Sequence, residues 1–243
     1  PSNPDTSVRS GMDAVAWAKA GLVDLIVPTP FWASMEFDMP IREWRRRLAG
    51  TDVTLAGGLE VLVRASNTAP LSYATPEHAV GAAVAVLTGG ADAVYLFNYF
   101  PSQHPKWPTA DYVSTLRALN DLTELLKRAR RHTVTFRDTL APGEAYQPPL
   151  PAEGAALEFR LPTGPRPPAG WQAALEIGVE ATPGVGAPTT TVNGQACRPL
   201  PEPITSHAAP VVFGYGVPVA ALADVDANRI AVSEVMIRWP DTA

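Results

Sequence analysis

The sequence predicts two domains of different class, an α/β domain over residues 1–131 and an antiparallel β-sandwich over residues 132–243. In the first part, short apolar runs alternate with helical segments, which is typical of a parallel sheet covered by helices on both faces. In the second part, apolar and polar residues alternate between Pro- and Gly-rich turns, which is typical of half-buried antiparallel strands. A chain of 243 residues also favours two domains over one.

The α/β domain begins with a helix over residues 11–21, for which Gly21 is a natural stop. A short strand is expected at residues 22–28, which end in the apolar run LIVP. A long loop, TPFWASMEFDMP, follows it. Pro40 is suited to the first turn of the next helix, which we expect to continue to Gly50.

The second strand is VTLAGGLE, residues 53–60. Thr75 and Pro76 then form an N-cap followed by proline at the first helical position, and the Ala- and Val-rich helix after them is expected to be buried. The third strand is ADAVYLFNY, residues 91–99, and a last helix is predicted over residues 111–131.

The β-sandwich is predicted from period-two alternation. Its expected strands include residues 133–138, 156–161, 174–180 and 235–239. The dipeptide Asn193-Gly194 predicts a tight hairpin turn.

Composition and charge exclude several classes of function. A formal net charge of −5 argues against a nucleic-acid partner, which would need a basic face, and no apolar run approaches the roughly 20 residues that span a membrane. The single cysteine, Cys197, excludes a disulfide within the chain. The histidines show no ligand spacing and no Gly-rich phosphate loop is present, so we predict no metal site and no cofactor.

Two blocks of the α/β domain resemble a known group of proteins. The segments GMDAVAWAKAGLVD (residues 11–24) and GGADAVYLFNYF (residues 89–100) resemble the C-terminal part of mostly uncharacterised bacterial glycoside-hydrolase-like (β/α)8 barrels. In that group the first block follows the fifth strand, and the second block forms the eighth. This chain departs from the group at Ala93, where glycine is frequent.

The resemblance implies that residues 1–131 form the C-terminal half of a TIM-type barrel, roughly strands six to eight. The group's acidic segment at the end of the fourth strand has no counterpart in this sequence. We therefore expect a polypeptide segment outside this chain to carry the N-terminal half of the barrel. Residues 215–232 similarly resemble the closing strands of galactose-binding-like sandwiches, which bind sugars in some enzymes and only brace the barrel in others.

Glu60 is the predicted catalytic residue. It ends the second strand, and working groups in such barrels lie at the carboxyl ends of strands. A carboxylate there would serve as nucleophile or general base, as the resemblance implies for the seventh strand. The alternatives are that Glu60 binds a sugar hydroxyl or only holds a neighbouring loop.

Five further residues are predicted to contact substrate: Trp32, Glu36, Asp38, Asn98 and His104. Glu36 and Asp38 lie in the long loop after the first strand and are also candidates for the second carboxylate that glycoside hydrolysis needs. Asn98 follows the third strand, where its amide would bind a sugar hydroxyl or cap the next loop. His104 is either close to the site or simply exposed.

Aromatic side chains near the strand ends provide a candidate stacking platform for sugar rings. They are Trp32, Tyr99, Phe100 and Trp107, and ordinary packing of loops is the alternative for each of them. Asp13 and Asp24 belong to the resembling blocks, and we expect them to form a buried structural pair.

These predictions favour a glycoside-hydrolase-like protein that acts on an unknown carbohydrate once the barrel is complete. The alternative is a non-catalytic carbohydrate-binding or scaffolding protein. A carboxylate facing Glu60 would favour the enzyme, and an apolar residue there would favour the binding protein.

Overall fold

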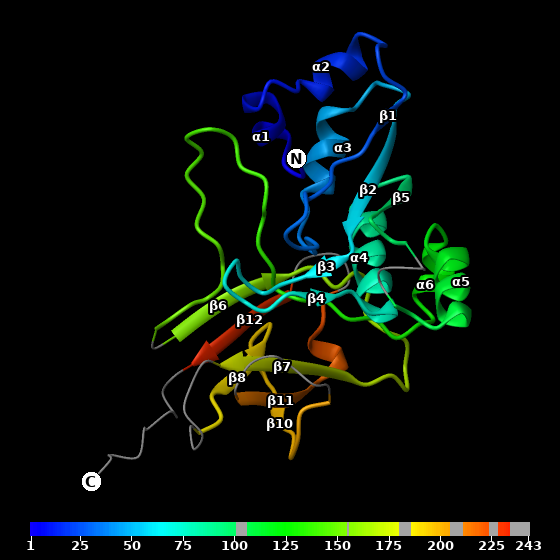
Figure 1. The fold of residues 1–243 in the computed structure, drawn as a ribbon. Coiled ribbons are helices and arrows are strands. Elements are labelled where there is room, and N and C mark those ends of the chain that lie inside the picture. Colours follow the sequence, from blue (N-terminus) through cyan, green and yellow to red (C-terminus); the bar gives the residue numbers. More distant parts are fainter. Residues whose placement is uncertain (101–105, 155, 180–185, 205–210, 224–227, 234–243) are drawn as a thin grey trace. The chain divides into compact units, whose positions relative to one another are not determined.

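The fold is described by a computed structural model, which covers residues 1–100, 106–154, 156–179, 186–204, 211–223 and 228–233. Figure 1 shows the chain coloured along its sequence. It divides into two compact units, Pro1–Pro151 and Ala152–Ala243. This division falls later in the chain than the boundary expected near residue 131.

A small parallel sheet forms the centre of the first unit. Its strands are β1 (Leu25–Ile26), β2 (Thr54–Glu60) and β5 (Ala93–Phe97), in the order β1-β2-β5. Both pairings are parallel, so neighbours in the sheet follow one another in chain order, as they do in a (β/α)8 barrel. Among the described residues the sheet stays open and no closed barrel is present.

Helix α4 (Pro76–Thr88) confirms the sequence prediction in detail. Thr75 is its N-cap, Pro76 occupies the first turn, and most of the side chains from His78 to Val86 are buried. Two glycines permit close packing: a Cβ on Gly57 of β2 would lie 2.6 Å from Cβ of Val86, and one on Gly81 of α4 would overlap the carbonyl of Arg131. The expected helix before β2 is also present as α3 (Ile41–Arg47).

The remaining elements of the first unit are short. They are α1 (Pro4–Arg9), α2 (Ala14–Lys19), the hairpin of β3 (Leu62–Val63) and β4 (Ser72–Tyr73), α5 (Thr109–Ala118) and α6 (Leu122–Leu125). The single helix predicted over residues 111–131 is therefore two helices, because Asp121 caps a new start at α6. The expected buried pair of aspartates is wrong: Asp13 is an exposed N-cap of α2, and Asp24 is also exposed.

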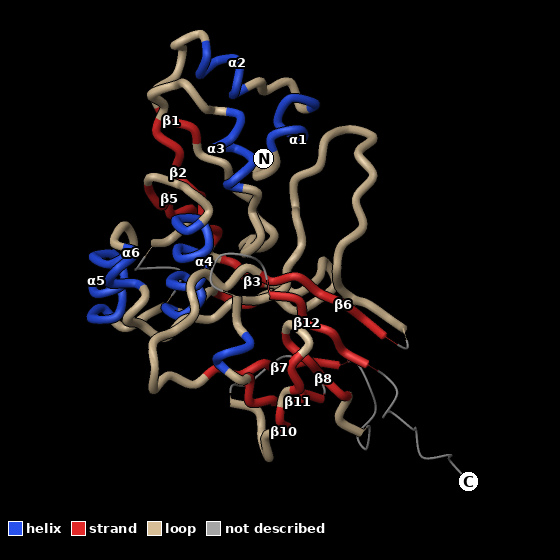
Figure 2. The backbone as a smooth tube through the Cα atoms, turned by 180° about the vertical axis from the view of Figure 1, so that it is seen from behind, coloured by secondary structure: helices blue, strands red, loops and turns tan. Residues whose placement is uncertain are grey.

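The predicted strand at residues 133–138 is absent. Figure 2 shows the chain between α6 and the second unit as a long loop, and residues 129–151 contain no helix or strand. Side chains hold this segment against the loop after β1 in place of a strand ladder. Thr135 Oγ1 donates to the carbonyl of Met35 at 2.6 Å, and Asp138 accepts from the amides of Phe31 and Ala33. The buried residues here, Thr135 and Phe136, are adjacent, so the alternation in sequence does not correspond to alternating burial.

The second unit contains two antiparallel sheets. One has the order β10-β11-β7 and the other β6-β12-β8-β9. The strands are β6 (Ala156–Leu161), β7 (Ala173–Val179), β8 (Thr189–Val192), β9 (Gln195–Ala196), β10 (Arg198–Pro199), β11 (Val211–Val217) and β12 (Asn228–Ser233), with a 3-10 turn, η1 (Val219–Ala221), after β11.

Two of the strands predicted from alternation are present, as β6 and as β7 over most of the range expected at residues 174–180. Strand β6 alternates exposed and less exposed residues, and β8 and β9 are joined by the predicted Asn193-Gly194 turn. The predicted strand over residues 235–239 lies outside the described residues.

Candidate functional site

Glu60 is the last residue of β2, at the carboxyl end of the central strand of the parallel sheet. The strand is buried along nearly its whole length, and Glu60 itself is 0% exposed. Its two glycines allow the neighbouring chain to approach. A Cβ on Gly58 would overlap the side chain of Thr29, which brings the loop after β1 directly over β2.

The Glu60 carboxylate is held by backbone amides. Oε1 accepts from the amide of Val61 at 2.9 Å, and Oε2 accepts from the amide of Trp32 at 3.3 Å. Burial raises the pKa of Glu60, and the amides of Trp32, Val61 and Leu62 oppose that rise because they favour the charged form. This geometry positions the carboxylate firmly, and it leaves the side chain without contact to solvent in this conformation.

Asp138 is a second carboxylate that binds the same loop as Glu60. Its Oδ2 accepts from the amide of Phe31 at 2.8 Å and from the amide of Ala33 at 2.9 Å. Because Glu60 accepts from the amide of Trp32 between them, the two carboxylates hold three consecutive amides. The negative charge of Asp138 also contributes to the raised pKa of Glu60.

The sequence analysis missed Asp138 because its segment alternates like a strand and was assigned to the β-sandwich. The signal that would have found it is the polar Arg-Asp-Thr run at residues 137–139, which breaks that alternation.

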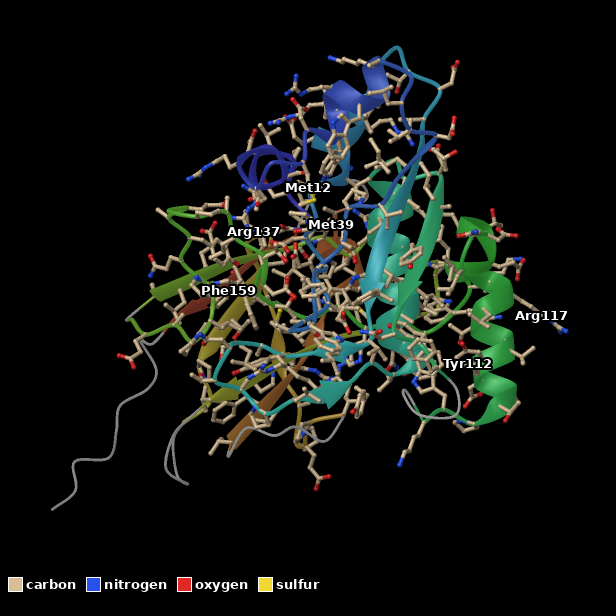
Figure 3. All side chains as sticks on the ribbon, turned by 45° about the horizontal axis from the view of Figure 1, so that its top comes forward. Met12, Met39, Tyr112, Arg117, Arg137 and Phe159 are labelled. Atoms are coloured by element: carbon tan, nitrogen blue, oxygen red, sulfur yellow. The ribbon has the colours of Figure 1, made fainter. Side chains whose placement is uncertain are left out.

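Arg137 fixes the segment that carries Asp138. Its guanidinium donates to Glu144 at 2.5 Å and to Thr6 Oγ1 at 3.0 Å, and it lies 4.8 Å from the ring centre of Tyr146. The ion pair is mostly buried, with side-chain exposures of 15% and 11%. The Tyr146 hydroxyl also accepts from the backbone amide of Arg137 at 2.9 Å. Arg137 is labelled in Figure 3.

Two exposed aromatic rings belong to residues whose amides the carboxylates bind. Phe31 is 64% exposed and Trp32 is 65% exposed, with 6.1 Å between their ring centres. Phe31 also lies 6.3 Å from Phe97, the last residue of β5. Exposed aromatic faces at the ends of strands are suited to stacking on sugar rings. Trp32 is one of the predicted substrate contacts, and its exposure is compatible with that role.

Trp32 and Asn98 share an unusual backbone conformation. Their φ angles are +72° and +63°, in the left-handed region that bulky residues rarely adopt. Asn98 directly follows β5 and is half-buried, while Trp32 lies in the loop after β1. Strain of this kind concentrates at binding and catalytic sites, where the surrounding structure holds it in place.

Glu36 and Asp38 have different surroundings. Glu36 is 3% exposed and accepts from Ser2 Oγ at 2.8 Å, and burial raises its pKa to about 8. It is therefore protonated at neutral pH and lies below the surface. Asp38 is exposed, yet neighbouring protein atoms crowd its carboxyl group, and this desolvation raises its pKa. Of the two, only Asp38 is open to a ligand in this conformation.

The remaining aromatic candidates fall into two groups. Phe100 is 55% exposed, whereas Tyr99 is buried and donates its hydroxyl hydrogen to the carbonyl of Glu60 at 3.3 Å. Trp107 donates from Nε1 to the carbonyl of Ala74 at 2.7 Å and meets Tyr99 edge-on, so it packs the loops together. His104 lies outside the described residues.

A pair of histidines lies near the site without forming a metal centre. His78 and His132 lie on either side of Phe37, with ring centres 6.2 Å and 5.9 Å from it. Burial and the nearby Arg130 lower the pKa of His132 to about 3, so its ring stays neutral. Within the described part of the chain, no group of three or more His, Cys, Asp or Glu side chains is placed to bind a metal ion.

The comparisons with known proteins add no relative. No protein-family model matches the sequence, and no curated protein matches it. The resemblance to glycoside-hydrolase-like barrels therefore rests on the motifs quoted above and stays a prediction. Among the described residues, no helix is long and apolar enough to cross a membrane.

Proposed function

We propose that this chain forms part of a glycoside-hydrolase-like (β/α)8 barrel that acts on a carbohydrate, with a β-sandwich as its accessory domain. The observation that carries the proposal is that Glu60, at the carboxyl end of β2, and Asp138 bind consecutive amides of one loop, whose Phe31 and Trp32 rings are exposed. Carboxylates in the same loop contact as exposed aromatic rings combine groups that can cleave a glycosidic bond with a surface that can bind sugar rings.

The proposed chemistry needs two carboxylates and no cofactor. In glycoside hydrolysis one carboxyl group protonates the leaving oxygen, and the other attacks the sugar or activates water. Burial raises the pKa of Glu60, which favours its protonated form relative to an exposed carboxyl group. Asp138 is our candidate for the second carboxylate, because it binds the same loop as Glu60.

The proposal includes a partner segment that completes the barrel. Within the described residues β1 and β5 each pair with β2 alone, so each leaves one edge of the sheet without a neighbour. Apolar side chains are exposed on both outer strands, with Leu25 of β1 at 52% and Tyr95 of β5 at 45%. Native mass spectrometry of the protein purified from its source tests this part: a bound polypeptide is expected, and a stable 25.8 kDa species alone would overturn it.

Hydrolysis by the complete assembly is the decisive test of the enzyme. Glu60→Gln keeps the shape of the side chain and removes its charge, so release of reducing ends from a panel of glycans should fall by at least about a thousandfold. Asp138→Asn should cause a comparable loss. Glu153→Gln, an exposed glutamate of the second unit, is the matched control and should keep full activity. Near-normal hydrolysis by Glu60→Gln would reject the catalytic assignment.

One observation favours a non-catalytic carbohydrate-binding protein as the second candidate. Glu60 is 0% exposed and its carboxylate is occupied by backbone amides, while Phe31 and Trp32 are open to solvent. In that case Trp32→Ala would abolish retention on a glycan column and Glu60→Gln would leave it unchanged. For the enzyme, Glu60→Gln would lose a hydrolysis that the wild-type assembly has, whereas the binding protein has none to lose, so hydrolysis measured beside retention separates the two functions.

A further inference from the structure

We propose that residues 29–33 form a gate over Glu60, latched shut by the carboxylates of Glu60 and Asp138. The gate matters for catalysis only if the proposed function holds, because a buried Glu60 must become accessible before it can touch a sugar. The latch itself is a property of the fold. It can therefore be measured without any substrate.

The latch consists of three consecutive amides. Phe31 and Ala33 donate to Asp138, and Trp32 between them donates to Glu60. The two acceptors come from distant parts of the chain, 107 and 28 residues away from the amides that they hold. Charged acceptors make stronger hydrogen bonds than neutral ones, so these bonds dominate the closed position of the loop.

Fixed points bound the segment on both sides. Before it, the carbonyl of Pro28 accepts from the amide of Gly58 at 2.8 Å, which continues the contact between β1 and β2. After it, Ser34 Oγ donates to the carbonyl of Arg64 at 2.9 Å, and Met35 donates to the carbonyl of Leu62 at 2.7 Å. The residues between these anchors are the part that can move as a unit.

The closed position stores strain. Trp32 adopts a φ of +72°, which is unfavourable for a residue with a large side chain. The rings of Phe31 and Trp32 remain about two-thirds exposed, and the apolar contacts of the segment are those of the buried Pro30 and of Phe31 with Phe97. The carboxylates thus oppose the strain, and weakening either of them should release the segment.

Asp138 is the acceptor of this latch that we expect to stay in place. Its neighbour Arg137 is held by Glu144, Thr6 and the ring of Tyr146, and Thr139 donates to Asp138 Oδ1 at 2.9 Å. Asp138 therefore stays in place when residues 29–33 move. Opening uncovers Glu60, because the amide of Trp32 is one of the groups that cover its carboxylate.

Amide hydrogen exchange of the intact chain tests the latch directly. In Asp138→Ala, the amides of Phe31 and Ala33 should exchange at least tenfold faster than in the wild type, while those of β2 keep their rates. Trp32→Gly removes the strain, so exchange at residues 31 and 33 should slow several-fold. Glu153→Ala is the control and should change neither region. Unchanged exchange at residues 31–33 in Asp138→Ala would overturn the gate.

Carbodiimide coupling of an amine to accessible carboxyl groups provides a second measurement. Glu60 should remain unmodified in the wild type and become modified in Asp138→Ala, as read by peptide mass. If exchange rises equally across all of β2, the variant has unfolded the unit, and the conservative Asp138→Asn then decides: local acceleration confined to residues 31–33 supports the gate, and none rejects it. Failure of hydrolysis in the complete assembly rejects the proposed enzyme without affecting these results.

Discussion

The two units differ in where non-glycine residues adopt left-handed backbone and in whether carboxyl groups are buried. In the described part of the second unit, the non-glycine residue with positive φ is Asn193, in the tight β8–β9 turn where asparagine is favoured. In the first unit, the corresponding residues are Trp32 and Asn98, and neither lies in a hairpin that demands this conformation. The first unit also buries Glu36 and Glu60, whereas the described residues of the second unit include no buried carboxylate.

This difference supports the choice of the first unit for the candidate site. The described part of the second unit shows no comparable departure in left-handed backbone or in buried carboxylates. The first unit breaks the rules at the carboxyl ends of its parallel strands and in the loop beside them. Such departures cost stability, and natural proteins keep them mainly at functional sites.

The largest expected effect is that of Glu60→Ala on the free energy of unfolding. Glu60→Ala leaves the amides of Trp32, Val61 and Leu62 without their acceptor, and each unsatisfied buried donor costs about 1–3 kcal/mol. We expect a loss of about 5 kcal/mol in the free energy of unfolding of the first unit, measured by urea denaturation. Glu153→Ala in the second unit is the control, with an expected change within about 0.5 kcal/mol. Equal effects of the two changes would remove the contrast between the units.

The pH dependence of stability tests the second buried carboxyl group. Glu36 has a pKa near 4.5 in the unfolded chain and about 8 in the folded one. Between these values the folded state binds more protons, so the free energy of unfolding falls as the pH rises from about 4.5 to 8. The total loss is on the order of 4 kcal/mol.

Glu36→Gln should flatten that profile, since the glutamine cannot ionise. The variant is expected to match the wild type near pH 5 and to exceed it in stability at pH 8. Denaturation curves at several pH values, with Glu153→Gln as the control, measure the difference. A wild-type profile that is flat across this range would show that Glu36 ionises normally.

A smaller and purely local loss of stability is expected for Gly194→Ala, in the turn between β8 and β9. Gly194 has a φ of +81°, and an added Cβ meets no atom within 4 Å there. Gly194→Ala should therefore cost about 1 kcal/mol through backbone conformation alone. Thermal unfolding of the wild type and the variant measures it. A loss several times larger would reveal a packing role for this turn.

The smallest expected effect is that of Trp32→Gly on stability. Relief of the left-handed strain offsets the greater entropy of glycine in the unfolded chain, so the net change should stay within about 1 kcal/mol. Asn193→Gly is the matched change in the second unit and should be similarly neutral. The two variants differ in their effect on glycan binding, which only Trp32→Gly should lose. Retention on a glycan column distinguishes them.

Part of the candidate site was predictable from sequence. Glu60 stands out because it ends an apolar strand, and the structure places it at the carboxyl end of β2 as expected. The exposure of Trp32 agrees with its predicted role, whereas Glu36 proved buried below the surface. Asp138 was not predicted: the polar run at residues 137–139 marks a break in the alternation, but it does not reveal the contact with the amides of Phe31 and Ala33, more than a hundred residues away.

The sequence by itself determined the elements that depend on neighbours along the chain. The Thr75-Pro76 helix start, the apolar strand of β2 and the Asn193-Gly194 turn follow from capping, burial and backbone preference. Only the tertiary structure decided that residues 133–138 form a loop within the first unit, that Glu60 and Asp138 bind three consecutive amides, and that burial raises the pKa of Glu36. The physical reason is that hydrogen bonding and desolvation depend on groups brought together in space, which no local pattern encodes.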